Sequence, residues 1–208
     1  MRTTHRRVGV LGGTFDPIHF GHLILAEEAL FQFELDCVLF LLTPFPPHKA
    51  EQTLTSPAHR LKMVELAVQD HPSFEISRVD LDRPPPHYAV DSVRIIRESL
   101  CPAEVFYLMG GDSLRDLPKW HEPQKFLQEC DGLAVMHRSI EDESVLDLEA
   151  QLPGIAGKVN FLTAPRFDIS SREIRHRVAY GLPFRYFLPT PVYRYILDNG
   201  LYRRVVER

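Results

Sequence analysis

The chain has 208 residues, of which 44% are hydrophobic and 25% are charged, so it can bury the core of an ordinary globular domain. Its formal net charge of -4 supplies no general basic field, and nucleic acid is therefore not an expected partner. No run of about 18 apolar residues occurs, so we expect no membrane span. The scattered Cys37, Cys101 and Cys130 form no metal or redox motif. With no apolar signal region after the first residues, they favour a cytoplasmic location.

Short apolar runs alternate along the chain with stretches of helical period. In chain order the expected elements are strand 7–11, helix 19–33, strand 37–42, a helix from Ser56–Pro57, strand 74–81, helix 90–100, strand 104–109, strand 133–136, helix 141–151, strand 159–162, helix 171–180 and helix 191–199. Strands that are apolar on both faces and alternate with helices predict an α/β fold, with a Rossmann-like doubly wound parallel sheet and helices on both of its faces.

We expect one domain over residues 1–208, in which residues 168–208 form a small helical part at the C-terminal side. The helix from Ser56–Pro57 begins with a serine cap and a proline in the first turn. Its expected apolar face consists of Leu61, Val64, Leu66 and Val68. Ligands of such sheets bind at the carboxyl ends of the strands, near the point where strand order reverses.

Residues 12–22, Gly-Gly-Thr-Phe-Asp-Pro-Ile-His-Phe-Gly-His, join the first strand to the first helix. Glycines let a backbone approach a phosphate, and a helix N-terminus offers N–H donors. The spacing is neither the dinucleotide fingerprint nor a Walker loop. His19 and His22 are three residues apart and share a helix face, while Gly21 leaves room for a ligand. The alternative is a pair of core or capping histidines.

Residues 169–175, Ile-Ser-Ser-Arg-Glu-Ile-Arg, have the pattern of a helix start. Ser170 and Glu173 have the spacing of a capping box. The hydroxyls of Ser170 and Ser171, together with Arg175, would suit an anion. An ordinary capped helix is the alternative interpretation of the same residues.

The stretch His19-Phe20-Gly21-His22 resembles the H-x-G-H signature of a nucleotidyltransferase superfamily, and residues 169–175 resemble its I-S-[ST]-x-x-I-R signature. The resemblance implies that the histidines bind and polarise a triphosphate, and that Ser170 and Arg175 close over its β- and γ-phosphates. Class I aminoacyl-tRNA synthetases carry a related first signature. They would use a lysine-rich K-M-S-K-S loop and a much longer chain, which argues against that class.

Further stretches resemble the bacterial nicotinate-nucleotide adenylyltransferases over nearly the whole chain. They are Pro46–Lys49, Gly111–Ser113 followed by Trp120, and the ending 188–203. Two stretches depart from the family. The usual Ser/Pro-Tyr-Thr segment reads His87-Tyr88-Ala89, which lacks the threonine hydroxyl, and the usual Arg-Pro-Gly reads Arg138-Ser139-Ile140. The first departure leaves open the choice between the acid and the amide form of the mononucleotide.

The resemblance implies adenylyl transfer from ATP to nicotinate mononucleotide, giving nicotinate adenine dinucleotide and pyrophosphate in NAD biosynthesis. The implied catalytic residues are His19, His22, Lys49 and Arg175. The implied ATP-binding residues are Gly12, Gly13, Thr14, Phe15, Gly21, Asp112, Ser170 and Ser171. The implied mononucleotide-binding residues are Tyr88, Ala89 and Trp120.

Three of these residues have plain alternatives. Lys49 is either a positioned cation in a proline-stiffened loop or a solvated lysine. Trp120 either stacks on a pyridine ring or packs at the edge of the core. Asp112 either holds a ribose hydroxyl or caps the helix at Ser113. Asp16, before Pro17, is expected to fix the geometry of its turn.

The attacking 5′-phosphate is already anionic, so the implied reaction needs no general base, only in-line positioning and charge stabilisation. Mg²⁺ is expected to bridge the phosphates without a dedicated set of protein ligands. The expected partners are ATP and nicotinate mononucleotide, and the chain is expected to be a monomer or a small homo-oligomer. The alternatives are an enzyme that prefers nicotinamide mononucleotide and a non-catalytic nucleotide-sensing module.

Overall fold

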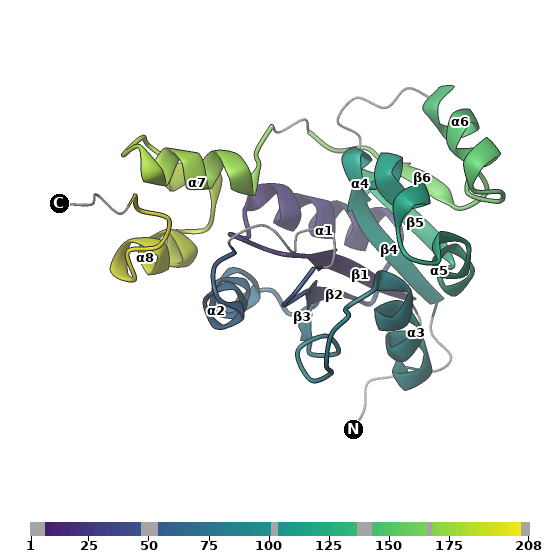
Figure 1. The fold of residues 1–208 in the computed structure, drawn as a ribbon, viewed down its shortest axis with the longest axis horizontal. Coiled ribbons are helices and arrows are strands. Elements are labelled where there is room, and N and C mark those ends of the chain that lie inside the picture. The colour runs from purple at the N-terminus through teal and green to yellow at the C-terminus, as the bar shows by residue number, and fades with distance from the viewer. Residues whose placement is uncertain (1–6, 47–53, 101–103, 137–142, 166–167, 205–208) are drawn as a thin grey trace.

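A computed structural model describes residues 7–46, 54–100, 104–136, 143–165 and 168–204 (Figure 1). These residues form a six-stranded sheet in the order β3-β2-β1-β4-β5-β6, and all neighbouring strands are parallel. The strands are β1 (Arg7–Gly13), β2 (Cys37–Leu42), β3 (Phe74–Ser77), β4 (Glu104–Gly110), β5 (Gly132–Met136) and β6 (Val159–Leu162). Strand order reverses between β1 and β4, so the predicted doubly wound sheet is confirmed.

The described helices are α1 (Phe20–Gln32), α2 (Pro57–Val68), α3 (Ala89–Leu100), α4 (Gly111–Asp116), α5 (Pro123–Glu129), α6 (Glu143–Gln151), α7 (Ser171–Ala179) and α8 (Thr190–Asp198). Short 3-10 turns occur at Leu117–Lys119 and Arg185–Phe187. None of the helices in the described part of the chain is long and apolar enough to cross a membrane.

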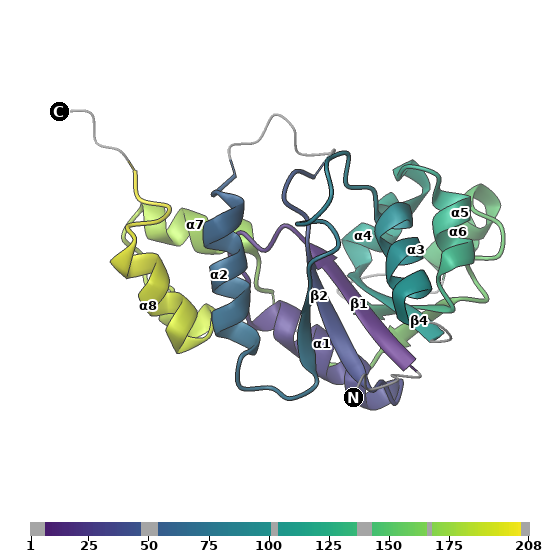
Figure 2. The same ribbon diagram turned by 90° about the horizontal axis from the view of Figure 1, so that it is seen from below.

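Two apolar clusters pack against opposite faces of the sheet. Along β2, Leu39 and Leu41 belong to the cluster under α3, α5 and α6, whereas Phe40 and Leu42 belong to the cluster under α1, α2, α7 and α8. Every residue of β2 is buried, as a strand covered on both faces requires. Figure 2 shows α3, α5 and α6 to the right of β1 and β2, with α2, α7 and α8 to the left.

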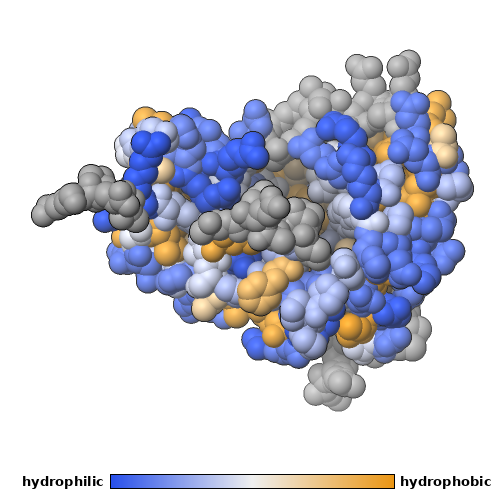
Figure 3. Space-filling view, in the orientation of Figure 1, coloured by the Kyte–Doolittle hydropathy of each residue, from blue (hydrophilic) through white to orange (hydrophobic). Residues whose placement is uncertain are grey.

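The C-terminal helical part packs against α2. Val192 and Ile196 of α8 are buried in the same cluster as Met63 and Val64 of α2. Residues 168–204 carry seven arginines against three acidic residues, a formal charge of +4 within a chain of net charge -4. Hydrophilic side chains accordingly cover the region of α7 in the space-filling view (Figure 3). One of these arginines, Arg175, reaches the turn that follows β1.

The strand expected over 74–81 is shorter in the structure and ends at Ser77. The N–H groups of Leu81 and Asp82 both bond to the carbonyl of Arg78, so the chain turns there and leaves the sheet. Helix α5 was not expected, and α4 was expected only as a helix at Ser113 without bounds. Each has seven residues or fewer, too short for a helical period to stand out in the sequence.

The expected apolar face of α2 is partly wrong. Val64 and Val68 are buried as expected, but Leu61 and Leu66 are only partly buried. The buried face instead includes Arg60, three and four residues before Met63 and Val64. The Arg60 guanidinium is satisfied there by backbone carbonyl groups.

Candidate functional site

The two signature stretches meet at the carboxyl end of β1, beside the reversal of strand order. Ser171 Oγ donates to the carbonyl of Pro17 at 2.8 Å, across 154 residues of sequence. Arg175 Nη1 donates to the carbonyl of Asp16 at 2.7 Å. The start of α7 is thus fastened directly to the turn between β1 and α1, and both present N–H and cationic groups at one place.

His19 and His22 lie against each other at the start of α1. Their ring centroids are 3.8 Å apart, with an interplanar angle of 31°, and His19 is 4% exposed. The backbone N–H of His19 donates to Nδ1 of His22 at 3.2 Å. A nitrogen that accepts a hydrogen bond carries no proton, so neutral His22 carries its proton on Nε2. The contact therefore fixes His22 as a donor through Nε2.

The glycines of the turn make room for side chains of this protein. A Cβ at Gly21 would lie 3.0 Å from the His19 ring, so Gly21 lets His19 pack closely, and its contact with a ligand stays a prediction. A Cβ at Gly12 would overlap the hydroxyl of Tyr107, which reaches across from β4. These two glycines therefore let the rings of His19 and Tyr107 pack closely against the turn.

Phe15 is an expected ATP-binding residue whose side chain belongs to the core. It is 2% exposed, and its ring meets the His22 ring edge-on at 5.1 Å. Its φ of 48° lies in the left-handed region, which costs a bulky residue energy. The Phe15 ring therefore supports His22, and only the Phe15 backbone is in a position to contact a nucleotide.

Ser170 forms the cap of α7 that its spacing predicts. Its Oγ accepts the N–H of Glu173 at 3.1 Å. The Glu173 carboxylate does not return to the cap, because it accepts Arg177 Nε at 2.8 Å. Half of the predicted capping box therefore forms, and the hydroxyl of Ser170 is engaged in shaping the helix start.

The buried guanidinium of Arg60, which sequence reasoning missed, ties two loops together. It is 1% exposed and donates to four backbone carbonyls. One belongs to Thr14, in the turn after β1, at 2.9 Å. The others belong to Thr43, Pro44 and Thr55, in the segment between β2 and α2. Arg60 therefore sets the position of the β1–α1 turn against the neighbouring loop.

The sequence does hold a signal for Arg60. The residue stands one helical turn before Met63 and Val64, at a position where an apolar side chain would continue the core face. Burial lowers the pKa of Arg60, whereas the nearby Asp16 opposes that shift. An arginine on the apolar face of a helix is worth testing as a clamp on backbone carbonyls.

Asp16 is a buried carboxylate at the centre of the turn, 3% exposed. Its Oδ1 accepts the hydroxyl of Tyr202 at 2.7 Å, and its Oδ2 accepts the N–H of Thr55 at 3.2 Å. Burial, followed by the Asp16 charge, raises the pKa of Tyr202, so Tyr202 stays protonated and remains the donor. Asp16 fixes the turn, as expected, but it does so through a residue 186 positions away.

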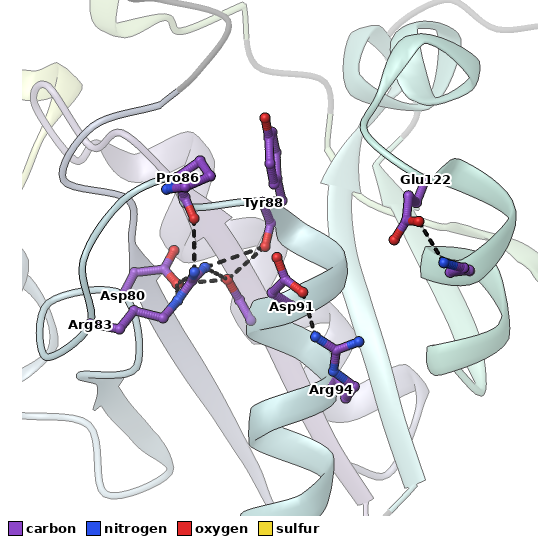
Figure 4. A network of polar contacts seen from close by, with 9 residues as sticks. Asp80, Arg83, Pro86, Tyr88, Asp91, Arg94 and Glu122 are labelled. Carbon is purple, nitrogen blue, oxygen red and sulfur yellow. Dashed lines mark hydrogen bonds and ion pairs between the residues drawn. The ribbon is translucent and has the colours of Figure 1, made fainter.

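A second polar network holds the loop between β3 and α3 (Figure 4). Asp80 Oδ1 accepts Arg83 Nη2 at 2.9 Å and Ser92 Oγ at 2.6 Å. Arg83 also donates to the carbonyls of Pro86 and Tyr88. The Asp80 side chain is only 2% exposed. Within the described residues, Arg83 is the one cation that bonds to it and balances its charge. The network presents Tyr88 at the start of α3.

The predicted mononucleotide-binding residues gather on this side. The Tyr88 ring stacks on His121 at 3.8 Å and 20°. Trp120 comes just before His121 in the chain. Its ring centroid lies 5.3 Å from that of Phe126 and 6.0 Å from that of Tyr107, which it meets edge-on. Tyr88, Ala89 and Trp120 all border the same apolar cluster. The packing of Trp120 thus matches the core-edge alternative, while contact with a pyridine ring stays a prediction.

His87, next to Tyr88, is buried beside Phe45 of the segment that follows β2. It is 4% exposed and its ring lies parallel to Phe45 at 6.2 Å and 19°. Within the described residues its Nδ1 has no hydrogen-bond partner. Burial lowers the pKa of His87, an effect that Asp80 opposes and Arg83 reinforces, so the ring is held neutral.

Asp112 does not cap α4, because Gly110 occupies the N-cap position. The Asp112 side chain is exposed and pairs with Arg115 at 3.2 Å, and its contact with a ribose stays a prediction. Lys49 and the stretch Arg138–Ile140 lie outside the described residues. In the part of the chain that is described, no group of three or more His, Cys, Asp or Glu side chains could hold a metal ion.

Comparison with known proteins agrees with this geometry. Residues 10–177 match the cytidylyltransferase-like family, so the fold and the paired signatures define a nucleotidyltransferase. The chain is 44% identical to a probable nicotinate-nucleotide adenylyltransferase of Thermomicrobium roseum over 96% of this chain and 92% of the relative. It is 41% identical to one of Dictyoglomus thermophilum, over 94% and 99%. The chain belongs to the nicotinate-nucleotide adenylyltransferases within that family.

Solved structures confirm the fold. The nicotinic acid mononucleotide adenylyltransferase of Plasmodium falciparum complexed with NaAD superposes with a TM-score of 0.79, at 18% identity, over 98% of this chain and 100% of that one. The same enzyme complexed with APC superposes with a TM-score of 0.76. Family membership makes this chain an enzyme, which sets aside the non-catalytic sensing module.

Proposed function

We propose that this chain transfers the adenylyl group of ATP to nicotinate mononucleotide, giving nicotinate adenine dinucleotide and pyrophosphate. The observation that carries the proposal is the contact of the two signature stretches. Ser171 and Arg175 bond to the carbonyls of Pro17 and Asp16, two and three residues before His19. Donors from both ends of the chain therefore converge where a triphosphate would lie, at the carboxyl end of β1.

In this proposal the triphosphate lies over the start of α1. His22 donates from Nε2 to an oxygen of the reacting α-phosphate, and His19 keeps the His22 ring in place. Arg175, Ser170 and Ser171 neutralise and bind the departing β- and γ-phosphates. Lys49 adds a cation from the β2–α2 segment. The backbone of Gly12 to Phe15 and the side chain of Asp112 contact the rest of the ATP.

The chemistry needs no base from the protein. The phosphate of the mononucleotide attacks the α-phosphorus in line, and the bond from that phosphorus to the pyrophosphate breaks. Negative charge gathers on the non-bridging oxygens and on the leaving group. Preorganised donors such as His22 Nε2 and the Arg175 guanidinium stabilise that charge.

The mononucleotide would lie on the β3–α3 side. Tyr88 and Trp120 offer aromatic surface for a pyridine ring, and Ala89 opens α3, whose first N–H groups attract a carboxylate. Nicotinamide mononucleotide is the second candidate, because Ala89 lacks the hydroxyl of the family's usual threonine. The two substrates differ only in a carboxylate and a carboxamide, so this helix start decides between them.

A divalent cation, Mg²⁺, is proposed to accompany ATP. The described residues offer no carboxylate set for it, so the phosphates and water would hold it, and no step is assigned to it. We further propose that residues 1–208 act as one domain in the cytoplasm, with residues 168–208 closing over the triphosphate. The buried free thiols Cys37 and Cys130 suit a reducing compartment.

The test is pyrophosphate release by the purified protein with ATP and either mononucleotide. We expect turnover with nicotinate mononucleotide and a lower kcat/KM with the nicotinamide form. Faster turnover with the amide would replace the proposed substrate. No turnover with either mononucleotide, from protein that binds ATP, would reject adenylyl transfer to pyridine mononucleotides.

A further inference from the structure

A hydrogen-bonded chain runs from the C-terminal segment into the triphosphate turn. Tyr202 lies after α8 with a φ of 64°, and its hydroxyl donates to Asp16 Oδ1 at 2.7 Å. The same Asp16 offers its backbone carbonyl to Arg175 Nη1 at 2.7 Å. One residue thus links a tyrosine that is remote from the proposed substrates to an arginine that would bind them.

We propose that Tyr202 is a positioning residue: through Asp16 its hydroxyl holds the β1–α1 turn and Arg175 in the geometry that binds the triphosphate. The inference rests on the proposed ATP site. Tyr202 itself touches no substrate in this proposal, and it acts only through Asp16.

Because Asp16 is buried, loss of the Tyr202 hydroxyl would leave its carboxylate short of a donor. Asp16 is 3% exposed, so water cannot readily replace a lost donor at Oδ1. Among the described residues, the other hydrogen bond to this carboxylate comes from the backbone N–H of Thr55, on Oδ2 at 3.2 Å. Without Tyr202 Oη the carboxylate would turn toward Thr55 or toward solvent. Either movement shifts the Asp16 carbonyl, and Arg175 with it.

The two arginines near Asp16 are already engaged, which leaves few donors to replace Tyr202 at its carboxylate. Arg60 is close enough to Asp16 to influence it electrostatically, but its guanidinium is engaged by the carbonyls of Thr14, Thr43, Pro44 and Thr55. Arg175 already bonds the backbone of Asp16. The Tyr202 hydroxyl is therefore the contact through which the C-terminal segment governs this carboxylate.

The chain provides a matched control in Tyr195. Its hydroxyl also joins the C-terminal helical part to α2, through His59 Nδ1 at 2.8 Å. Both tyrosines are partly buried, and each loses a short hydrogen bond on replacement by phenylalanine. Tyr202 also loses a long contact with Met63 Sδ at 3.9 Å. Only Tyr202 bonds to the turn. A purely structural role would make Tyr202→Phe and Tyr195→Phe behave alike.

The experiment measures ATP binding by calorimetry without a second substrate, together with KM and kcat for both substrates and the melting temperature. We expect Tyr202→Phe to weaken ATP binding and raise KM for ATP about tenfold, with KM for the mononucleotide within about twofold. Tyr195→Phe should melt at a similarly lowered temperature with ATP binding within about twofold of the parent. Unchanged ATP binding in Tyr202→Phe, or equal losses in both variants, overturns the proposal.

Asp16→Asn and the double variant with Tyr202→Phe complete the test. If Tyr202 acts through Asp16, the two changes are non-additive in ATP affinity, whereas additive losses contradict the proposal. Because ATP binding is read directly, this result is separate from the identity of the second substrate. A parent protein that binds ATP but fails to use either mononucleotide would reject the proposed function and leave the positioning role to be judged by binding.

Discussion

The turn after β1 and the loop before α3 are fixed in opposite ways. The turn, residues 14–19, is held from far away in the sequence, by Arg60 of α2 and by Arg175 and Tyr202 of the C-terminal part. The loop, residues 78–88, is held by neighbours, since Asp80, Arg83 and Ser92 bond among themselves. The turn on the proposed ATP side therefore depends on contacts from distant parts of the chain, whereas the polar network of the loop on the proposed mononucleotide side is local in sequence.

This difference has a practical meaning for substitutions. A change on the local side should alter recognition of the second substrate and leave ATP binding intact. A change around the turn should alter ATP chemistry even when it lies far away. The following predictions test that separation, from the largest expected effect to the smallest.

His22→Ala should lower kcat about a hundredfold or more, because one preorganised donor to the reacting phosphate is lost. Circular dichroism should show an intact fold. The exposed His176, whose ring packs on Tyr180, provides the control, and His176→Ala should turn over normally. Turnover of His22→Ala close to that of the parent would remove His22 from the mechanism.

Arg83→Met should lower the free energy of unfolding by about 3 kcal/mol, since the buried Asp80 carboxylate loses its cation. KM for the mononucleotide should rise several-fold, with ATP binding unchanged. Urea denaturation and steady-state kinetics measure both. Arg78→Met breaks an exposed pair with Asp82 in the same loop, and should leave the free energy of unfolding close to that of the parent, because solvent screens such pairs. A rise in KM for ATP in Arg83→Met would contradict the separation of the two sides.

Ala89→Thr places a hydroxyl at the first residue of α3. We expect the ratio of kcat/KM for nicotinate over nicotinamide mononucleotide to rise about fivefold, because a hydroxyl donor favours a carboxylate. Competition between the two mononucleotides measures the ratio directly. Ala89→Ser serves as a smaller hydroxyl donor and should change it in the same direction. A ratio that stays the same in both variants would place the discriminating contact elsewhere.

The buried thiols of Cys37 and Cys130 lie outside both proposed substrate sides, so they provide a test of stability that involves neither substrate. Burial raises the pKa of Cys37 and of Cys130 to about 12, from an ordinary thiol value of 9.0. Between these values the unfolded chain releases thiol protons that the folded chain keeps, so stability should fall as pH rises from about 9 to 12. Urea denaturation at several pH values measures the fall, and it should shrink in Cys37→Ala. A flat profile across this range would show that the thiols ionise in the folded state.

The sequence predicts the turn better than it predicts what holds it. Gly12, Gly13, His19 and His22 are close together in the chain, and strand, turn and helix follow from local pattern. The roles of Gly12 and Gly21 are different, because Tyr107 and His19 fill the space that each missing Cβ leaves. Those contacts depend on tertiary packing, which spacing does not reveal.

Arg60, Arg83 and Tyr202 were missed for a related reason. Each is an ordinary polar residue in sequence, and its importance arises from burial and from its partners. The helix from Ser56–Pro57 was expected correctly, but its buried face was assigned by apolar residues alone, which excluded Arg60. A polar side chain at a core position of a helix is the signal that would have found it.

The hydrogen bond from Tyr202 to Asp16 has a consequence for synthesis of the protein. The segment that carries Tyr202 follows all six strands and α8 in the chain, so the turn after β1 receives this donor only when residue 202 has been translated. A chain cut after α8 but before residue 202 would keep every strand and still lack this donor to Asp16.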